Sequence, residues 1–322
     1  MYPKIPLEEL ANEYFDIDTT ADLLTQEERR KISDISDWIF SQAFEIVGTA
    51  QYNNIGLRCA TDRVRNYLLG LMTANAVRYA KQISGREVLM AELGMGAGIT
   101  VQSALAVEPD TRILAYEQDA YTIEFAESLL RSKGLLDKVK IIQGDFLKET
   151  FPTNIDVVVN ENIGPDLISE PQFQASARII PYTHEKTLFV PGGADVYLVA
   201  ENNRSRKNGI LLGRVDFSRA YRSPIKLEAQ IPERMLDDFG KYFPYCFMLS
   251  DLLDCNGRRF LTEKGENGIE TLRLMKIIYH KFERYSFVRS PKSDYCLRLY
   301  ISLEGDDPGI VYSAAAYLKK GL

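Results

Sequence analysis

The residues best suited to chemistry follow the ends of short apolar runs. The segment Val88–Thr100, VLMAELGMGAGIT, has an apolar run that ends on Glu92 and then contains Gly94, Gly96 and Gly98. Closely spaced glycines let the backbone turn tightly, so that a bulky ligand can rest on main-chain N–H groups at a helix N-terminus. The acid at the end of the run suits a cationic or amino-bearing ligand better than a pyrophosphate. We therefore expect S-adenosylmethionine (SAM) as the cofactor.

Two further strand ends carry groups that fit an adenosine. Glu117 ends the next apolar run, ILAYE, where a carboxylate can accept hydrogen bonds from both ribose hydroxyls. Asp145 and Phe146 follow the third run, KIIQGDF, which places an acid and an aromatic ring beside the expected adenine. Nicotinamide enzymes use a related loop, G-x-G-x-x-G, but here Ile99 stands where its last glycine would fall. The glycine spacing and the acids after successive strands together favour SAM over a nicotinamide dinucleotide.

A pair of carboxylates follows the fourth run, in the segment NENIGPDLISE. Glu161 and Glu170 lie at either end of a short loop, with Asn160 as a polar neighbour. A loop at this place lies over the reactive end of the cofactor. The group that best matches two carboxylates is a guanidinium, which is planar and has five N–H donors. We therefore assign Glu161, Glu170 and Asn160 to the acceptor side of the site.

These residues need a sheet that brings strand ends together. Strand-like runs alternate with helix-like segments between residues 51 and 191, which predicts an α/β fold with a doubly wound parallel sheet, a Rossmann-like SAM-binding domain. The predicted strands are Val88–Ala91, Ile113–Tyr116, Val139–Ile142, Ile155–Val159 and Thr187–Val190.

The two ends of the chain differ from this middle part. Residues 1–50 are predicted to be helical, and Thr25 and Glu28 have the spacing of a capping box. Residues 192–322 are predicted to form a smaller β-rich domain. Its strand-like runs are Val196–Ala200, Ile210–Phe217, Leu272–Tyr279 and Cys296–Leu303. The predicted domains are therefore 1–50, 51–191 and 192–322.

Composition narrows the class of protein. The chain has 322 residues, 45% of them hydrophobic, and a net charge of −6, which gives no basic surface for nucleic acid. Its 4 cysteines lack paired metal-ligand spacing, so we expect reduced thiols and no metal. The sequence shows neither a signal peptide nor an apolar run long enough to cross a membrane. We expect a soluble, cytoplasmic protein that acts on a small molecule.

The motifs together resemble the protein arginine methyltransferases. A loop with two glutamates after the fourth strand is the hallmark of that family, and Glu161 and Glu170 match its spacing. Asp62–Leu69, DRVRNYLL, resembles the family's helix before the glycine loop, and this likeness implies that Arg65 holds the carboxylate of the cofactor. PGGADVYLVA resembles the family's passage from sheet into β-barrel. The resemblance covers about residues 50–200. It also implies that the domain of residues 192–322 serves substrate binding and dimerisation.

The acceptor loop departs from the family pattern. Between its glutamates the family has Trp-Met-Gly-Tyr, whereas this chain has Asn162-Ile163-Gly164-Pro165. The family's Thr-His-Trp loop is absent, because the single Trp is Trp38. We therefore expect N-methylation of a small guanidine or amine. An alternative is a SAM enzyme that transfers no methyl and closes SAM to azetidine-2-carboxylate, releasing methylthioadenosine, as azetidine-2-carboxylate synthases do.

Overall fold

A computed structural model gives the arrangement of most of the first 200 residues and of separate strands beyond them. It describes residues 7–9, 15–17, 23–49, 55–160, 162, 171–200, 210–219, 225–231, 245–253, 261–263, 280–281, 295–304 and 309–313. The helices of eight residues or more are α2 (Gln26–Thr49), α4 (Arg63–Ser84), α5 (Ile99–Val107), α6 (Ala120–Ser132) and α7 (Gln172–Ile179). Shorter ones are α3 (Ile55–Ala60), η1 (Leu136–Lys138) and η2 (Ile180–Tyr182).

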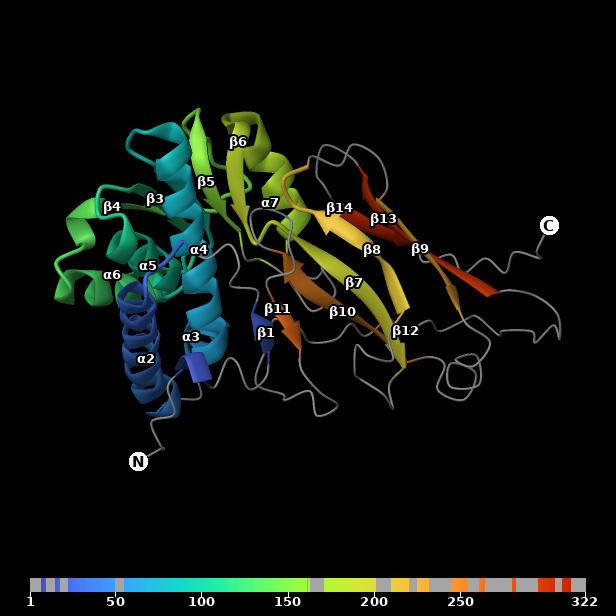
Figure 1. Ribbon diagram of the computed structural model, residues 1–322, viewed down its shortest axis with the longest axis horizontal. Helices are drawn as coiled ribbons and strands as arrows, with labels where there is room; N and C mark the ends of the chain where they lie inside the picture. Colours follow the sequence, from blue (N-terminus) through green and yellow to red (C-terminus); the bar gives the residue numbers. More distant parts are fainter. Residues whose placement is uncertain are drawn as a thin grey trace.

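The first 200 residues are built around a five-stranded parallel sheet with the order β4-β3-β2-β5-β6 (Figure 1). Its strands are β2 (Leu89–Leu93), β3 (Arg112–Glu117), β4 (Val139–Gln143), β5 (Ile155–Val159) and β6 (Thr183–Val190). In sequence order, β2 is the first strand of this sheet. The next two strands, β3 and β4, lie on one side of it, and the chain then crosses back so that β5 and β6 lie on the other side. The carboxyl ends of β2 and β5 therefore flank a topological switch point, where open α/β sheets bind ligands.

Side chains alternate between the two faces of β2, so each face packs against different helices. Leu89, Ala91 and Leu93 belong to a buried cluster that includes Ala175 and Ile179 of α7. On the other face of the sheet, Thr100 of α5 donates to Glu92 of β2, and α4 packs beside β5 and β6. The sheet is thus covered on both faces, and the predicted doubly wound α/β fold is confirmed.

The long helices begin and end where the sequence provides caps. Before α2, Thr25 N donates to Glu28 Oε2 at 2.8 Å and Glu28 N donates to Thr25 Oγ1 at 3.3 Å, which confirms the predicted capping box. Asp62 caps α4 by accepting from Arg65 N at 3.1 Å. That helix ends at Gly85, whose φ of +63° favours glycine.

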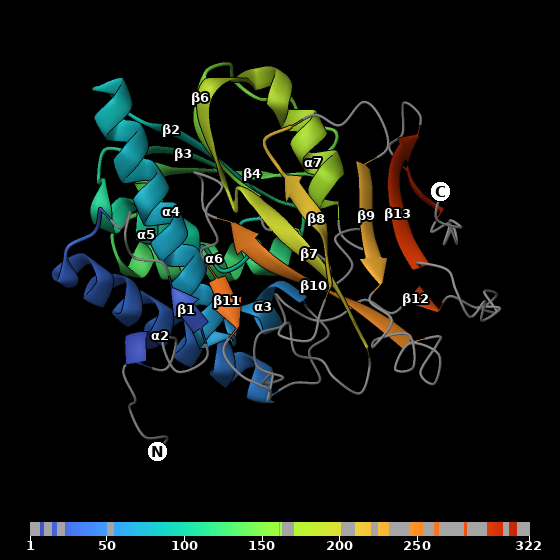
Figure 2. The ribbon, with the colours of Figure 1, turned by 45° about the vertical axis from the view of Figure 1, so that its right-hand side comes forward.

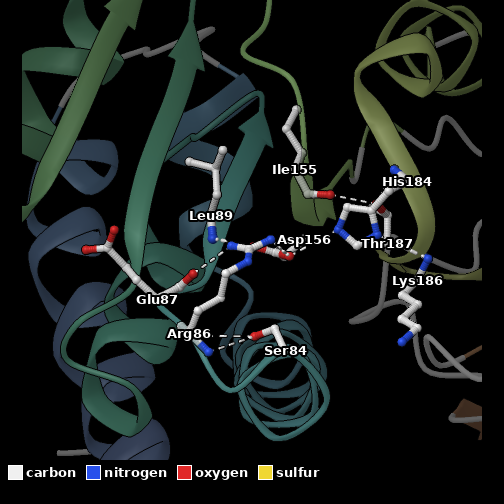
Figure 3. A network of polar contacts seen from close by, with 9 residues as sticks. All are labelled: Ser84, Arg86, Glu87, Leu89, Ile155, Asp156, His184, Lys186 and Thr187. Carbon is white, nitrogen blue, oxygen red and sulfur yellow. Dashed lines mark hydrogen bonds and ion pairs between the residues drawn. The ribbon is translucent and has the colours of Figure 1, made fainter.

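A buried carboxylate ties the starts of three strands together (Figure 3). Asp156, at the start of β5, accepts from both terminal nitrogens of Arg86 at 2.9 and 2.7 Å and from Leu89 N at 2.8 Å. His184 Nε2 on β6 lies 3.1 Å from its Oδ1. Only 3% of the Asp156 side chain is exposed, so these contacts compensate a buried charge. The network fixes the strand edge opposite to the glycine loop.

Antiparallel strands follow the parallel sheet and lie beside β6 and α7 (Figures 1 and 2). One sheet has the order β12-β10-β7-β8 and another has the order β14-β13-β9. Their strands are β7 (Gly193–Ala200), β8 (Ile210–Asp216), β9 (Ile225–Ile231), β10 (Tyr245–Leu253), β12 (His280–Lys281), β13 (Tyr295–Glu304) and β14 (Gly309–Ser313). The strands predicted near 196–200, 210–217 and 296–303 are present, whereas Leu272–Tyr279 lies outside the described residues.

One part of the N-terminal prediction is wrong. The first 50 residues were predicted to be helical, but β1 (Phe15–Ile17) is a strand that pairs antiparallel with β11 (Leu261–Glu263). The pairing partner is far away in the sequence, and local periodicity carries no information about it. The predicted domain limits after residues 50 and 191 stay predictions. Within the described part of the chain, no helix is long and apolar enough to cross a membrane.

Candidate functional site

The glycine loop has the backbone conformation that its sequence predicts. After β2, Gly94, Gly96 and Gly98 have φ values of +85°, +55° and +72°, in the left-handed region that other residues rarely adopt. Gly94 N and Met95 N both donate to Tyr116 O on β3, at 2.9 and 3.0 Å, which holds the turn against the neighbouring strand. No side chain caps α5 after Gly98, so its first N–H groups can serve a ligand.

Glu92 is buried inside β2, next to this loop. The strand was predicted to end at this acid, but it continues to Leu93. The residue is 3% exposed; Thr100 Oγ1 of α5 donates to its Oε1, and no group of the described chain donates to its Oε2. Burial raises the pKa of Glu92 to about 8; the negative charge of Glu117 adds to this rise and the Thr100 hydrogen bond opposes it. At neutral pH the carboxyl is therefore mostly protonated.

Glu117 lies at the end of β3 and contacts the glycine loop directly. Its Oε2 accepts from Gly96 N at 3.1 Å, and its Oε1 accepts from Gln118 N at 2.9 Å and Asp119 N at 3.0 Å. Two sequence-predicted cofactor residues, Glu117 and Gly96, are thus in contact although they are 21 positions apart. The carboxylate oxygens point to the same edge of the sheet as the loop.

Asp145 and Phe146 follow β4, on the far side of β3 from the glycine loop. Asp145 Oδ1 accepts from Leu147 N at 3.0 Å, and its Oδ2 lies 3.0 Å from Lys148 Nζ. Phe146 is partly buried and packs against the core cluster of β2 and β3. Both residues therefore lie at the carboxyl edge of the sheet, as predicted from their register.

Arg65 lies in the first turn of α4 and is partly buried. Ala60, just before that helix, packs in the same buried cluster as Ala97 of the glycine loop. The start of α4 is therefore close to the loop, as a residue that binds the same ligand requires.

A network of three side-chain amides joins the ends of β2 and β5. Asn162 Nδ2 donates to Leu93 O at 2.7 Å and to Asn160 Oδ1 at 2.8 Å, and Asn162 N donates to Gln172 Oε1 at 3.0 Å. Asn160, 1% exposed, donates from Nδ2 to Gln172 O at 3.0 Å and to Ser176 Oγ at 3.2 Å. Sequence reasoning missed Asn162 and Gln172; a polar Asn-x-Asn pair directly after a buried strand was the signal available.

Both predicted acceptor carboxylates, Glu161 and Glu170, lie outside the described residues. The roles of these glutamates and of Asn160 stay predictions. Among the residues that the structure describes, no group of three or more His, Cys, Asp or Glu side chains could hold a metal ion. A cavity of about 320 Å³ opens at the other edge of the sheet, lined in part by Arg86, His184 and Lys186, and none of the predicted site residues lines it.

Comparison of the sequence with known proteins gives a relative over about a third of the chain. No family model matches the chain. An uncharacterized protein of Methanocaldococcus jannaschii is 30% identical over 105 residues, which are 32% of this chain and 39% of that relative, so the chain spans well under half of its length.

Three solved structures of arginine methyltransferases share the fold. A Trypanosoma brucei PRMT1 enzyme-prozyme heterotetramer with AdoHcy (S-adenosylhomocysteine) has a TM-score of 0.58 at 12% identity, covering 83% of this chain and 96% of that one. Arabidopsis thaliana protein arginine methyltransferase 10 has a TM-score of 0.52 at 11% identity, covering 76% and 86%. PRMT6 with SAH has a TM-score of 0.50 at 10% identity, covering 75% and 94%. These structures therefore share the doubly wound α/β fold of this chain.

Proposed function

We propose that this chain is a SAM-dependent methyltransferase that binds SAM at the carboxyl edge of its parallel sheet. The observation that carries the proposal is the direct contact between the glycine loop and Glu117, at the switch point of the sheet. Glycine-loop N–H groups and an acid at the end of the next strand are what a nucleoside with a charged tail requires.

The described residues fit this ligand in two ways. A Cβ added to Gly96 would meet nothing within 4 Å, so the loop borders open space. Glu92 is a buried carboxyl with one unpartnered oxygen, and Glu117 raises its pKa further. A positive ligand in this space would favour the ionised form of Glu92, whereas a pyrophosphate would oppose it. The local charge thus supports SAM over a dinucleotide.

For the acceptor, we propose a small guanidine or amine. Glu161 and Glu170 would accept hydrogen bonds from its N–H groups and hold one nitrogen toward the cofactor. A guanidinium keeps its proton at neutral pH, so two carboxylates are needed to localise a lone pair on one nitrogen. Asn160 would act by positioning, because its amide is already engaged with α7.

When bound, SAM would supply an electrophilic methyl group on a sulfonium. The chain's own contribution would be to bind and orient. Arg65 would hold the carboxylate of the ligand, Glu117 the ribose and Asp145 the adenine side. The paired glutamates would align the acceptor nitrogen, and such positioning supplies most of the rate in transfers of this type. We also propose a cytoplasmic homodimer, for which sedimentation at several protein concentrations tests the oligomeric state.

Two measurements test the proposal. Calorimetric titration with SAM and with S-adenosylhomocysteine tests the cofactor, and absence of binding by both would refute the function at its first step. Incubation with SAM, with and without arginine or another guanidine, followed by mass spectrometry tests the reaction. S-adenosylhomocysteine formed only with the acceptor supports methyl transfer. Formation of methylthioadenosine and a cyclised amino acid from SAM alone would refute methyl transfer and support the azetidine-forming reaction.

The acceptor carboxylates are tested separately. Glu161→Gln should reduce acceptor-dependent turnover by at least about 100-fold, because a charge-assisted hydrogen bond of about 1.5–3 kcal/mol and the localised lone pair are both lost. SAM affinity should stay within about three-fold of the wild type. Unchanged turnover in this variant would remove Glu161 from the acceptor site and leave the cofactor assignment standing.

A further inference from the structure

Asn162 spans the switch point between the two halves of the sheet. Its side-chain nitrogen donates both to Leu93 O, at the end of β2, and to Asn160 Oδ1, just after β5. Its backbone N–H donates to Gln172 Oε1 at the start of α7. The carboxamide is therefore held in one place by contacts on both sides of the crevice in which open α/β sheets bind ligands.

The direction of this amide is determined by its neighbours. A backbone carbonyl can only accept, so Asn160 has to present its nitrogen to Gln172 O, which turns Asn160 Oδ1 toward Asn162. Asn162 in turn meets two acceptors, Leu93 O and Asn160 Oδ1, which requires its nitrogen on that side. The choice between amide nitrogen and oxygen thus follows from the network as a whole.

This arrangement leaves the oxygen of Asn162 available. Both hydrogens of Nδ2 are donated, and no donor among the described residues reaches Oδ1. The oxygen faces the glycine loop, because a Cβ added at Gly94 would lie 3.1 Å from it. Glycine at position 94 leaves this side of the oxygen open, whereas any other residue would approach it closely.

We propose that Asn162 Oδ1 binds the amino-acid ammonium of SAM. This inference rests on the proposed function and adds a ligand residue to it. The sheet order β4-β3-β2-β5 places Asp145 and Glu117, the acids assigned to the nucleoside, on one side of β2. Asn162 lies on the opposite side, at β5, where the other end of the same ligand must extend. An ammonium there meets a fixed neutral acceptor.

The test compares two ligands that differ only in the amino-acid part. S-adenosylhomocysteine carries the ammonium, and methylthioadenosine lacks it while keeping adenine, ribose and sulfur. In Asn162→Ala, the affinity for S-adenosylhomocysteine should fall by about 10-fold or more, as expected for a hydrogen bond to a charged group. The affinity for methylthioadenosine should stay within about two-fold. Titration calorimetry on the full chain measures both.

Asn75→Ala is the matched control. Asn75 on α4 has a similarly engaged amide, which accepts from Leu23 N at 2.8 Å and donates to Leu71 O at 3.1 Å, but it belongs to none of the site contacts. Its removal should leave the ratio of the two affinities unchanged. An equal loss for both ligands in Asn162→Ala, or no loss, overturns the inference. If the wild type binds neither ligand, the proposed function itself fails.

Discussion

Replacing Glu92 by glutamine should stabilise the ligand-free protein, although this glutamate belongs to the proposed cofactor site. Its carboxyl is buried in β2, and burial is the main reason that its pKa rises to about 8. Glutamine has the same shape, can still accept from Thr100 and does not ionise. The substitution therefore removes the cost of burying a group that the unfolded chain holds as an anion at neutral pH.

The size of the effect follows from the two pKa values. The unfolded carboxyl titrates near its ordinary value of 4.5 and the folded one at about 8. Because the folded value is raised, the folded state is fully favoured below about pH 4.5 and loses stability as the pH rises toward 8. Each pKa unit corresponds to about 1.4 kcal/mol, so the wild type loses about 3 kcal/mol by pH 7 and about 5 kcal/mol above pH 8.

Urea unfolding of both proteins at pH 5, 6, 7 and 8 measures this difference. Glu92→Gln should match the wild type near pH 5 to within about 1 kcal/mol and gain about 1.4 kcal/mol for each further pH unit up to about pH 8. Glu124→Gln, on the exposed side of α6, makes the same chemical change at the surface and is the matched control. A gain for Glu92→Gln that does not vary with pH, or a loss that grows with pH, would refute the reasoning.

Three other predictions concern contacts around the same sheet. Glu117→Gln should lower the affinities for S-adenosylhomocysteine and methylthioadenosine equally, by about 10-fold or more in calorimetry, because both ligands keep the ribose. A lower affinity for only one of them would show that Glu117 does not bind the ribose. Asp156→Asn should lower the free energy of unfolding by about 2–3 kcal/mol in urea, because it removes the buried anion that holds Arg86 and His184; a change below about 0.5 kcal/mol would contradict this. SAM binding near pH 7 should release up to one proton, because a cation lowers the raised pKa of Glu92; calorimetry in buffers of different ionisation enthalpy counts it, and proton uptake would exclude this coupling.

The sequence predicted the strands well where the signal is local. Buried parallel strands appear as short apolar runs, so β3 and β5 were found within a residue of their bounds, and the capping box marked the start of α2. β1 was missed because its pairing with β11 joins residues more than 240 positions apart. Nothing within a short window of the sequence encodes such a partner.

The sequence predicted the glycine-loop side of the candidate site better than the side at the end of β5. The side proposed for the cofactor follows from strand register, because parallel strands bring their carboxyl ends to one edge, and the structure places Glu117 in contact with Gly96. The amide network between Asn162, Asn160 and Gln172 was not predicted. Each of these hydrogen bonds depends on the placement of α7 against the end of β5, which only the folded chain defines.

The buried acid and the amide network have complementary consequences at the switch point. Glu92 lowers the stability of the empty protein in the neutral range, because burial keeps its carboxyl protonated there while the unfolded chain holds it as an anion. The amides add fixed hydrogen bonds between β2, β5 and α7 without adding a charge. The proposed site for a cation therefore combines an acid that is costly to bury while the site is empty with hydrogen bonds that do not depend on the ionisation of this acid. Asn162 contributes two side-chain hydrogen bonds to that frame, and its remaining oxygen is the one we propose for the ligand. Its replacement should therefore weaken the binding of ligands that carry the ammonium more than the binding of ligands that lack it.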